Sequence, residues 1–287
     1  DAHTAMLAGT ACLLAARRGD IAGRVRFFFQ PGEEGHGGAR SALEEGVLDA
    51  ADGGEAVSWA FAIHQSPSIP SAMVATKGGP IMASADEMFV TVRGRGGHAS
   101  MPHHGNDPIP VACEIVQALQ TWVTRRVDVF TPAVVTVARI RAGTTTNVIP
   151  ETARLDGTIR TVDRRVREEA HAAVRRIAEH VAAAHDMAAE VEIADGYPVT
   201  VNDAGAADDV LGTARWLVGD DLALAMPAPV MGAEDFSYVT EKVPGAMAFL
   251  GTRPAGVRPA DVAPNHSNRM VLDESVMAKG AALHAAI

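Results

Sequence analysis

The sequence predicts an α/β protein in which a main domain with a mixed sheet is interrupted by an inserted α+β domain. Apolar runs of strand length alternate with helical patterns over residues 1–78, which is typical of a sheet covered by helices. Over residues 86–193 the order becomes strand–helix–strand–strand–helix–strand, the order of a ferredoxin-like domain. Alternation resumes afterwards. We therefore expect a first part of the main domain at 1–80, the insertion at 81–197 and the second part at 198–287.

The elements of the main domain follow from apolar spacing and stop signals. The first helix is already in progress at Asp1 and ends where Arg17 and Arg18 precede Gly19. A chain that opens inside a helical pattern and without Met is expected to be a fragment or a processed product. The remaining elements are expected as strands at 24–29, 57–63, 73–76 and 246–250, and as helices at 2–18, 39–45, 206–217 and 273–286.

The inserted domain shows clear periodicity. Met88, Val90 and Val92 alternate with polar residues, which indicates a strand with one buried face. Two long amphipathic stretches, one of them rich in Ala, Arg and Glu, indicate helices. The expected elements are strands at 86–94, 134–140, 154–162 and 189–193, and helices at 109–125 and 164–185.

Composition excludes several classes of protein. The chain has 287 residues, of which 47% are hydrophobic and 21% charged, so a folded protein with two cores is expected. A net charge of −10 without a basic run argues against a nucleic-acid partner. Apolar stretches are too short for a membrane span, and no signal peptide is expected. Cys12 and Cys113 lie in apolar helical patterns and are expected to be buried thiols of a reducing compartment, which favours the cytoplasm.

Two adjacent acids, Glu33 and Glu34, follow the expected strand at 24–29 and the turn residues Pro31 and Gly32. The ends of buried strands are where α/β sheets place their chemistry. Neighbouring side chains on a turn point in different directions, so one acid can bind a metal while the other moves a proton of an attacking water. The simpler alternative is a solvated turn with two surface acids.

Other isolated polar residues of the main domain can complete such a site. His64 follows the expected strand at 57–63, Glu234 and Asp235 lie in a turn, and His266 precedes the last helix. A histidine that ends a strand is more often a structural residue. A carboxylate pair together with two histidines nevertheless supplies the mixed oxygen and nitrogen set that zinc or manganese accepts.

The inserted domain carries three further candidates. His98 lies among glycines, which suits a close approach to a ligand, and its ring could donate a hydrogen bond to a developing oxyanion. Asn147 lies in a polar loop and could bind a substrate carbonyl, although the loop could equally be an ordinary strand connection. Arg160 lies in a strand and could bind a substrate carboxylate, whereas a lone strand arginine usually faces solvent. Nearby, Asp107 is expected to cap the helix that opens with Pro108.

Together these motifs resemble the M20 metallopeptidases, in particular their amidohydrolase branch of hippurate hydrolase, N-acyl-amino-acid amidohydrolases and auxin-conjugate hydrolases. The resemblance covers essentially the whole chain. The matching segments are Asp1-Ala2-His3-Thr4-Ala5-Met6-Leu7, Gln30-Pro31-Gly32-Glu33-Glu34-Gly35, Gly97-His98-Ala99-Ser100, Asn147-Val148-Ile149-Pro150, Gly157-Thr158-Ile159-Arg160, Glu234-Asp235-Phe236 and His266.

The resemblance implies a zinc-exopeptidase-like catalytic domain, a lid that also forms a homodimer, and two divalent metal ions, zinc or manganese. It implies hydrolysis of the amide bond of N-acyl amino acids or related conjugates by a metal-activated water. The implied general base is Glu33, and the implied metal ligands are Glu34, His64 and His266. His98 would stabilise the tetrahedral intermediate, often from across a dimer interface, and Asn147 and Arg160 would bind substrate.

One departure from the family pattern leaves an alternative open. In this branch a Cys-Gly-His segment that carries two metal ligands normally precedes the position of Asp1, and it is not in this sequence. The chain holds three of the five ligands that the family uses. The alternative is therefore a catalytically impaired or non-catalytic dimeric fragment of the same fold.

Overall fold

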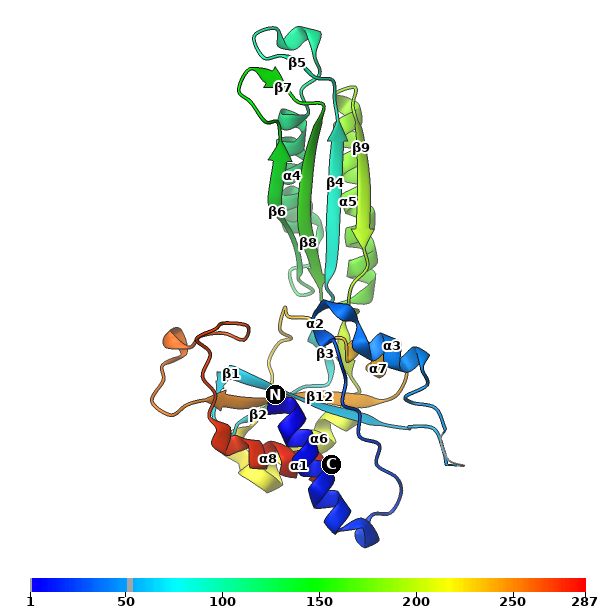
Figure 1. The fold of residues 1–287 in the computed structure, drawn as a ribbon, viewed down its shortest axis with the longest axis vertical. Helices are drawn as coiled ribbons and strands as arrows, with labels where there is room; N and C mark the ends of the chain where they lie inside the picture. The colour runs from blue at the N-terminus through cyan, green and yellow to red at the C-terminus, as the bar shows by residue number, and fades with distance from the viewer. Residues whose placement is uncertain (1, 51–53) are drawn as a thin grey trace. The chain divides into compact units, whose positions relative to one another are not determined.

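The computed structural model describes residues 2–50 and 54–287, so Asp1, the first residue of one motif above, lies outside the described residues. The chain divides into two compact units (Figure 1). The first unit comprises Asp1–Ile81, Thr200–Pro229 and Asp235–Ile287, and the second unit comprises Met82–Val199 and Val230–Glu234. Each unit is described by itself below.

The first unit contains a four-stranded mixed sheet with the strand order β1-β12-β2-β11. β1 runs parallel to β12, β2 runs antiparallel to β12, and β11 runs parallel to β2. β12 is buried along almost its whole length, as expected for a central strand. The strands are β1 Ala60–Pro70, β2 Val74–Thr76, β11 Ala223–Ala225 and β12 Gly245–Arg253, with a separate pair, β3 Gly79–Met82 and β10 Thr200–Asn202.

Helices of the first unit pack on this sheet and on one another. Met6, Val210 and Leu250, from a helix, another helix and the central strand, belong to one buried cluster. The Thr10 hydroxyl donates to the Ala281 carbonyl at 3.1 Å and so joins the first and last helices. The helices are α1 Ala2–Ala16, α2 Glu33–His36, α3 Gly38–Glu44, α6 Ala204–Val218, α7 Ser237–Thr240 and α8 Met277–Ala286, with 3-10 turns at Arg18–Asp20, Asp220–Leu222, Pro259–Asp261 and Glu274–Val276.

Two strand predictions for the first unit were wrong. Residues 24–29 do not form a strand, and Val25 and Phe29 are about half exposed. An extended segment becomes a strand only when another segment supplies its hydrogen-bond partners, and no described strand pairs with this one. The strand expected at 57–63 is β1, Ala60–Pro70, so His64 lies inside a strand rather than after it.

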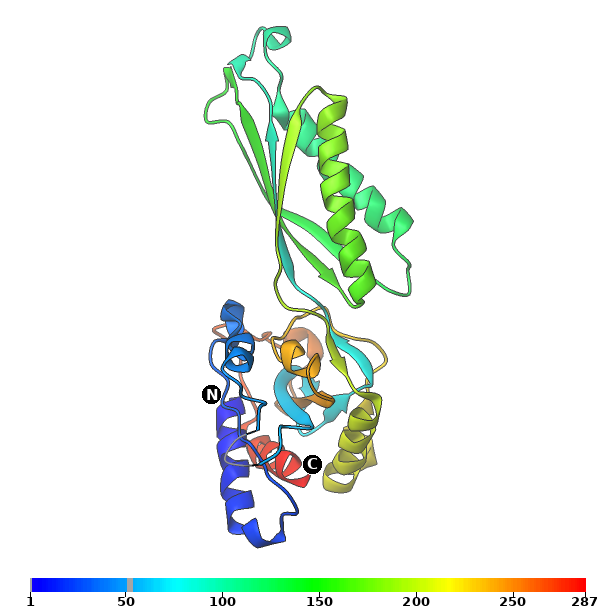
Figure 2. The same cartoon turned by 90° about the vertical axis from the view of Figure 1, so that its right-hand side faces the viewer.

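The second unit is built on an antiparallel sheet with the order β6-β8-β4-β9. Both long helices lie on the same face of this sheet (Figure 2). Met88, Leu155, Ile115 and Val174 belong to the core between sheet and helices. The elements are β4 Asp86–Arg93, β5 Gly97–His98, α4 Pro108–Arg126, β6 Ala133–Ala142, β7 Val148–Ile149, β8 Thr152–Thr161, α5 Arg164–Ala184 and β9 Ala188–Ala194, with a 3-10 turn at Pro102–His104.

Caps fix where the long helices begin. Asp107 accepts a hydrogen bond from the Ile109 amide at 3.0 Å, and Pro108 occupies the first helical position, as the sequence predicts. Asp163 caps α5 in the same way through the Val166 amide. Each cap therefore also holds the last residue of the loop that precedes its helix.

The prediction that both cysteines are buried was wrong. Cys12 and Cys113 are exposed in the structure. Both lie in helices with many apolar residues, and such a helix does not bury every one of its members. In the part of the chain that the structure describes, no helix combines the length and apolar character needed to cross a bilayer.

Candidate functional site

The acidic pair lies on a turn that the chain holds at both ends. Gly32 has a left-handed conformation with φ 61°, which glycine adopts without strain, and Glu33 follows it directly. The Gln30 side chain donates to the Asp235 carboxylate, whose other oxygen accepts from the Ala39 amide at 2.9 Å. Asp235 is fully buried. This buried carboxylate therefore fastens both sides of the Glu33–Glu34 turn.

Glu33 has the electrostatics of a proton acceptor. Burial raises the pKa of the Glu33 carboxyl, and the negative charges of Asp235 and Glu34 raise it further, while His266 acts in the opposite direction. Carboxylate oxygens of Glu33 and Asp235 lie within 4.8 Å of each other. A carboxylate with a raised pKa accepts a proton more readily from a reacting group at neutral pH.

His64 presents a free ring nitrogen. Its Nδ1 lies 2.6 Å from the Gln65 carbonyl oxygen, and a carbonyl only accepts, so Nδ1 carries the proton. The neutral ring then has its lone pair on Nε2, the arrangement seen when a backbone carbonyl orients a metal-binding histidine. Burial lowers the pKa of His64, which keeps the ring neutral. His64 can therefore bind a cation through Nε2.

His266 lies against the acidic turn. Its Nδ1 is 3.4 Å from Glu34 Oε1, and the His266 and Glu34 side chains are 70% and 75% exposed. His266 also has a left-handed backbone with φ 68°, which is uncommon for a residue other than glycine. The charge of His266 acts on the pKa of both Glu33 and His64, so all four residues share one region.

The predicted ligands converge in part. Glu34 and His266 are in contact, whereas His64 does not join them in a set of ligand atoms that all lie within 4.8 Å of one another, among the residues described. The exposed Glu34 and His266 side chains can change rotamer at little cost. One carboxylate and two imidazoles form a donor set that fits a borderline divalent ion such as zinc.

Two predicted residues of the second unit lie side by side. β5, which contains His98, pairs with β7, and the Ala99 amide donates to the Asn147 carbonyl at 3.0 Å. The Ser100 amide donates to His98 Nδ1 at 3.1 Å, so Nδ1 is the acceptor. The neutral ring therefore carries its proton on Nε2. His98 can donate that hydrogen bond to an anionic oxygen.

Arg160 lies at the other end of the same sheet. β5 follows the end of β4 where Arg93 pairs with Thr152, whereas Arg160 is beside the end where Asp86 pairs with Ile159 (Figure 1). Thr152 and Arg160 are about 26 Å apart along a strand that rises roughly 3.3 Å per residue. Within a single chain, His98 and Arg160 are therefore too far apart to contact the same small substrate.

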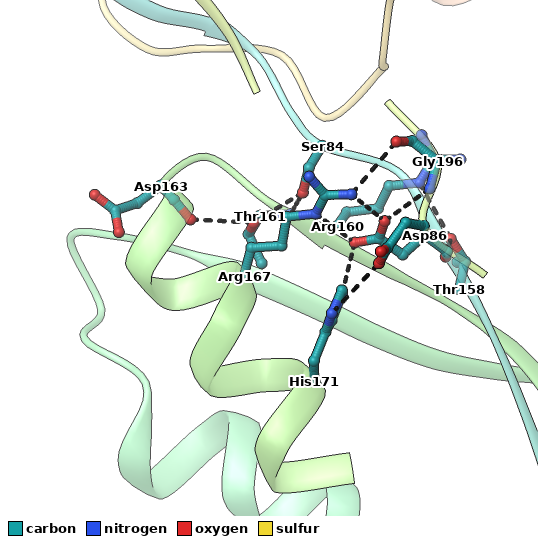
Figure 3. A network of polar contacts seen from close by, with 10 residues as sticks. Ser84, Asp86, Thr158, Arg160, Thr161, Asp163, Arg167, His171 and Gly196 are labelled. Carbon is teal, nitrogen blue, oxygen red and sulfur yellow. Dashed lines mark hydrogen bonds and ion pairs between the residues drawn. The ribbon is translucent and has the colours of Figure 1, made fainter. Parts of the chain in front are cut away.

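A polar network orients Arg160 (Figure 3). Its Nε donates to the Thr158 hydroxyl at 3.2 Å, and that hydroxyl donates to the Asp86 carbonyl at 3.0 Å. The Asp86 carboxylate in turn accepts from Arg167 and His171 on α5 and from the Gly196 amide. Among the residues that the structure describes, Arg160 is bonded through Nε, and its terminal nitrogens can therefore bind a ligand.

Sequence reasoning missed the roles of Asp235 and Gln65. The sequence shows Asp235 only as an acid in a turn, because its hydrogen bonds to the Gln30–Ala39 segment join residues about 200 positions apart. Gln65 gave no signal, because a glutamine within an alternating strand is unremarkable. Its burial at 6% exposure is visible only in the folded chain.

The family of the chain follows from comparison with known proteins. The model of "Peptidase family M20/M25/M40" matches residues 1–287. The chain belongs to this family. As a family member it is a hydrolase. The family assignment that the motifs predicted is confirmed.

Several relatives in the M20 family match most of this chain in sequence or in structure. Thermostable carboxypeptidase 2 of Saccharolobus solfataricus is 39% identical over 99% of the chain and 70% of its own length. N-acetylcysteine deacetylase of Bacillus subtilis is 39% identical over 88% of the chain, which spans 64% of that relative. The structure of a dinuclear metal-binding M20 peptidase of Bacillus subtilis matches with a TM-score of 0.81 and 33% identity, over the whole chain and 70% of that protein.

Proposed function

We propose that this M20 protein is a metal-dependent amidohydrolase that cleaves the amide bond of N-acyl amino acids or related conjugates. The observation that carries the proposal is the first-unit site, where Glu33 has a raised pKa, Glu34 contacts His266, and His266 acts on the pKa of both Glu33 and His64. A deacetylase of N-acetylcysteine among the relatives supports the class of substrate. The dinuclear metal-binding structural relative supports two divalent ions, with zinc or manganese as the expected metals.

In this proposal Glu34, His64 and His266 hold metal. Bound divalent ions would polarise the substrate carbonyl and make water acidic enough to attack it at neutral pH. Glu33 accepts a proton from the attacking water and passes it to the leaving amine nitrogen. The carbon–nitrogen bond breaks, and the products are the free acid and the amino acid.

Residues of the second unit complete the reaction. His98 donates its Nε2 proton in a hydrogen bond to the oxyanion of the tetrahedral intermediate. Asn147 binds a substrate carbonyl, and Arg160 pairs with the substrate carboxylate through its terminal nitrogens. The strand order β6-β8-β4-β9 supports a ferredoxin-like lid over residues 81–197.

A homodimer through the lid is part of the proposal. Because His98 and Arg160 are at opposite ends of one sheet, a site that uses both needs His98 from a second copy. A substrate of amino-acid size cannot bridge about 26 Å of strand.

Location in the cytoplasm stays a prediction of the sequence.

The direct test is Glu33→Gln in the enzyme that carries this chain. We expect hydrolysis of an N-acetyl amino acid to fall by roughly 10²- to 10⁴-fold, because the amide side chain cannot accept the proton. Bound metal, measured by inductively coupled plasma mass spectrometry, should not change. Glu44→Gln, an exposed acid of α3, is the matched control. Unchanged turnover in Glu33→Gln would remove Glu33 from the mechanism.

The alternative, a non-catalytic dimer of the same fold, is favoured by one observation. The three candidate ligands do not all meet within 4.8 Å among the described residues. The same metal analysis separates the two functions. About two ions per chain support the hydrolase, whereas a metal-free protein after incubation with zinc or manganese supports the non-catalytic dimer.

A further inference from the structure

We propose that Gln65 is a positioning residue that holds both candidate histidine ligands, His64 and His266, in the geometry that binds metal. The inference rests on the proposed metal site and adds a residue to it. Gln65 is buried in β1, and its main chain and side chain both make specific hydrogen bonds within the first unit. The main chain of Gln65 bonds His64, and its side chain bonds the residue before His266.

The main chain of Gln65 sets the state of His64. Its carbonyl accepts from His64 Nδ1 at 2.6 Å, which leaves Nε2 free. Its amide donates to His3 Nε2 at 2.9 Å, and the His3 and His64 rings lie with centroids 4.5 Å apart. The residue whose carbonyl selects the tautomer of His64 is therefore itself held by a side chain of α1.

The side chain of Gln65 reaches the loop of His266. Gln65 Nε2 donates to Asn265 Oδ1 at 2.8 Å, and the Thr252 hydroxyl of β12 donates to Gln65 Oε1 at 2.9 Å. Asn265 directly precedes His266, whose backbone has φ 68°. A left-handed conformation is unfavourable for a residue other than glycine, so surrounding contacts must hold it. The anchored Asn265 provides such a contact.

Only a primary amide fits this position. The Gln65 side chain meets an acceptor, Asn265 Oδ1, and a donor, the Thr252 hydroxyl, at the same time. Methionine has a similar shape but leaves both partners without a bond. Gln65→Met therefore releases the Asn265–His266 segment while it retains most of the packing volume.

The first measurement needs no metal. Hydrogen–deuterium exchange reports the opening of residues 264–270, where the Ser267 amide donates to the Pro264 carbonyl at 3.1 Å. We expect Gln65→Met to speed exchange in this segment at least about tenfold. Asn265→Ala should do the same, and the double variant should add little, because both changes break one link. Unchanged exchange in Gln65→Met would overturn the inference.

The second measurement uses cobalt(II) as the probe. We expect Gln65→Met to weaken cobalt affinity by 10- to 100-fold in chelator competition, and to alter the visible absorption of the bound ion. Asn202→Leu is the control, because Asn202 is a buried amide of the same unit that bonds Thr76 and Met247 instead of a candidate ligand. An equal loss of affinity in the control would reduce Gln65 to a general stabilising role and overturn the inference.

The two measurements separate this inference from the proposed function. If the unaltered protein binds no cobalt, zinc or manganese, the proposed function fails, and the exchange result still decides whether Gln65 holds the His266 loop. If the protein binds metal with equal affinity in Gln65→Met and unaltered forms, the positioning role fails while the proposed function stands.

Discussion

At the scale of single residues, Glu33 and Glu34 are neighbours in the chain with different surroundings. Burial and the nearby Asp235 raise the pKa of Glu33, whereas Glu34 is 75% exposed and contacts His266. The sequence predicts that one acid moves protons and the other binds metal, and the difference in environment supports that division. The charge and hydrogen-bond partners that create the difference come from distant segments, so spacing along the chain cannot predict them.

Arg160 gives a prediction at the same scale. Its Nε is fixed by Thr158, so its two terminal nitrogens form a fork that matches a carboxylate. We expect Arg160→Lys to raise KM for an N-acyl amino acid by roughly 10- to 100-fold with a smaller change in kcat, since a lysine cannot make the paired bonds. Steady-state kinetics measures both constants.

The control for Arg160→Lys is Arg93→Lys, which changes an exposed arginine on another strand of the sheet. A substrate whose carboxylate is converted to an amide gives a second check. Its KM should be high in the unaltered enzyme and should not rise further in Arg160→Lys. An equal rise for both substrates would argue against pairing between Arg160 and the carboxylate.

At the scale of elements, helices and alternating strands were easiest to predict from sequence. The helix expected at 109–125 is α4, Pro108–Arg126, because its cap, its proline and its apolar face all indicate the same limits. The segment 24–29 has the composition of a strand and is not one, because strand formation depends on a partner elsewhere. β1 continues past His64 for the opposite reason, since β12 supplies partners as far as Pro70.

The contacts of Asp86 join β4, α5 and the segment after β9 (Figure 3). Burial opposes ionisation of Asp86, but hydrogen bonds from His171, Arg167 and the Gly196 amide outweigh it and lower its pKa to about 2. A carboxyl whose pKa is lower in the folded state than in the unfolded chain stabilises the fold above the unfolded pKa. That stabilisation is lost as the pH falls toward 2.

We therefore predict that Asp86→Asn lowers the free energy of unfolding of the second unit by about 2 kcal/mol at pH 7. The difference from the unaltered protein should shrink between about pH 4 and pH 2, as Asp86 takes up its proton. Urea denaturation followed by circular dichroism at several pH values measures it. Glu190→Gln, which removes an exposed ion pair with Arg93, should show no comparable pH dependence. A constant difference across this pH range would contradict the prediction.

At the scale of the whole molecule, the residues proposed for the reaction are divided between the two units. Glu33, Glu34, His64 and His266 belong to the first unit, and the predicted substrate contacts belong to the second unit. Motifs could suggest these residues except His64, which the sequence places after an apolar run. The placement of His98 and Arg160 at opposite ends of one sheet could not be predicted from motifs, since it depends on strand register.

Mixed dimers test the proposed exchange of His98 between copies. Glu33→Gln and His98→Ala proteins should each have little activity. After unfolding and refolding together in equal amounts, half of the dimers carry one chain of each kind. If His98 acts on its partner's site, one site in each mixed dimer has both groups, and activity returns to about a quarter of the unaltered level. No recovery would show that each chain uses its own His98 or that the chains do not form dimers.

The main segment of the second unit, Met82–Val199, begins and ends at points that lie close together in space. The Ala85 amide donates to the Tyr197 carbonyl at 2.9 Å, and Asp86 binds the Gly196 amide next to it. An inserted segment whose ends lie side by side can be exchanged as a module, because a replacement needs only to join two closely spaced points. Selection can therefore graft a different insert at this junction and alter the range of accepted compounds, while the acidic turn and its histidines keep their own scaffold.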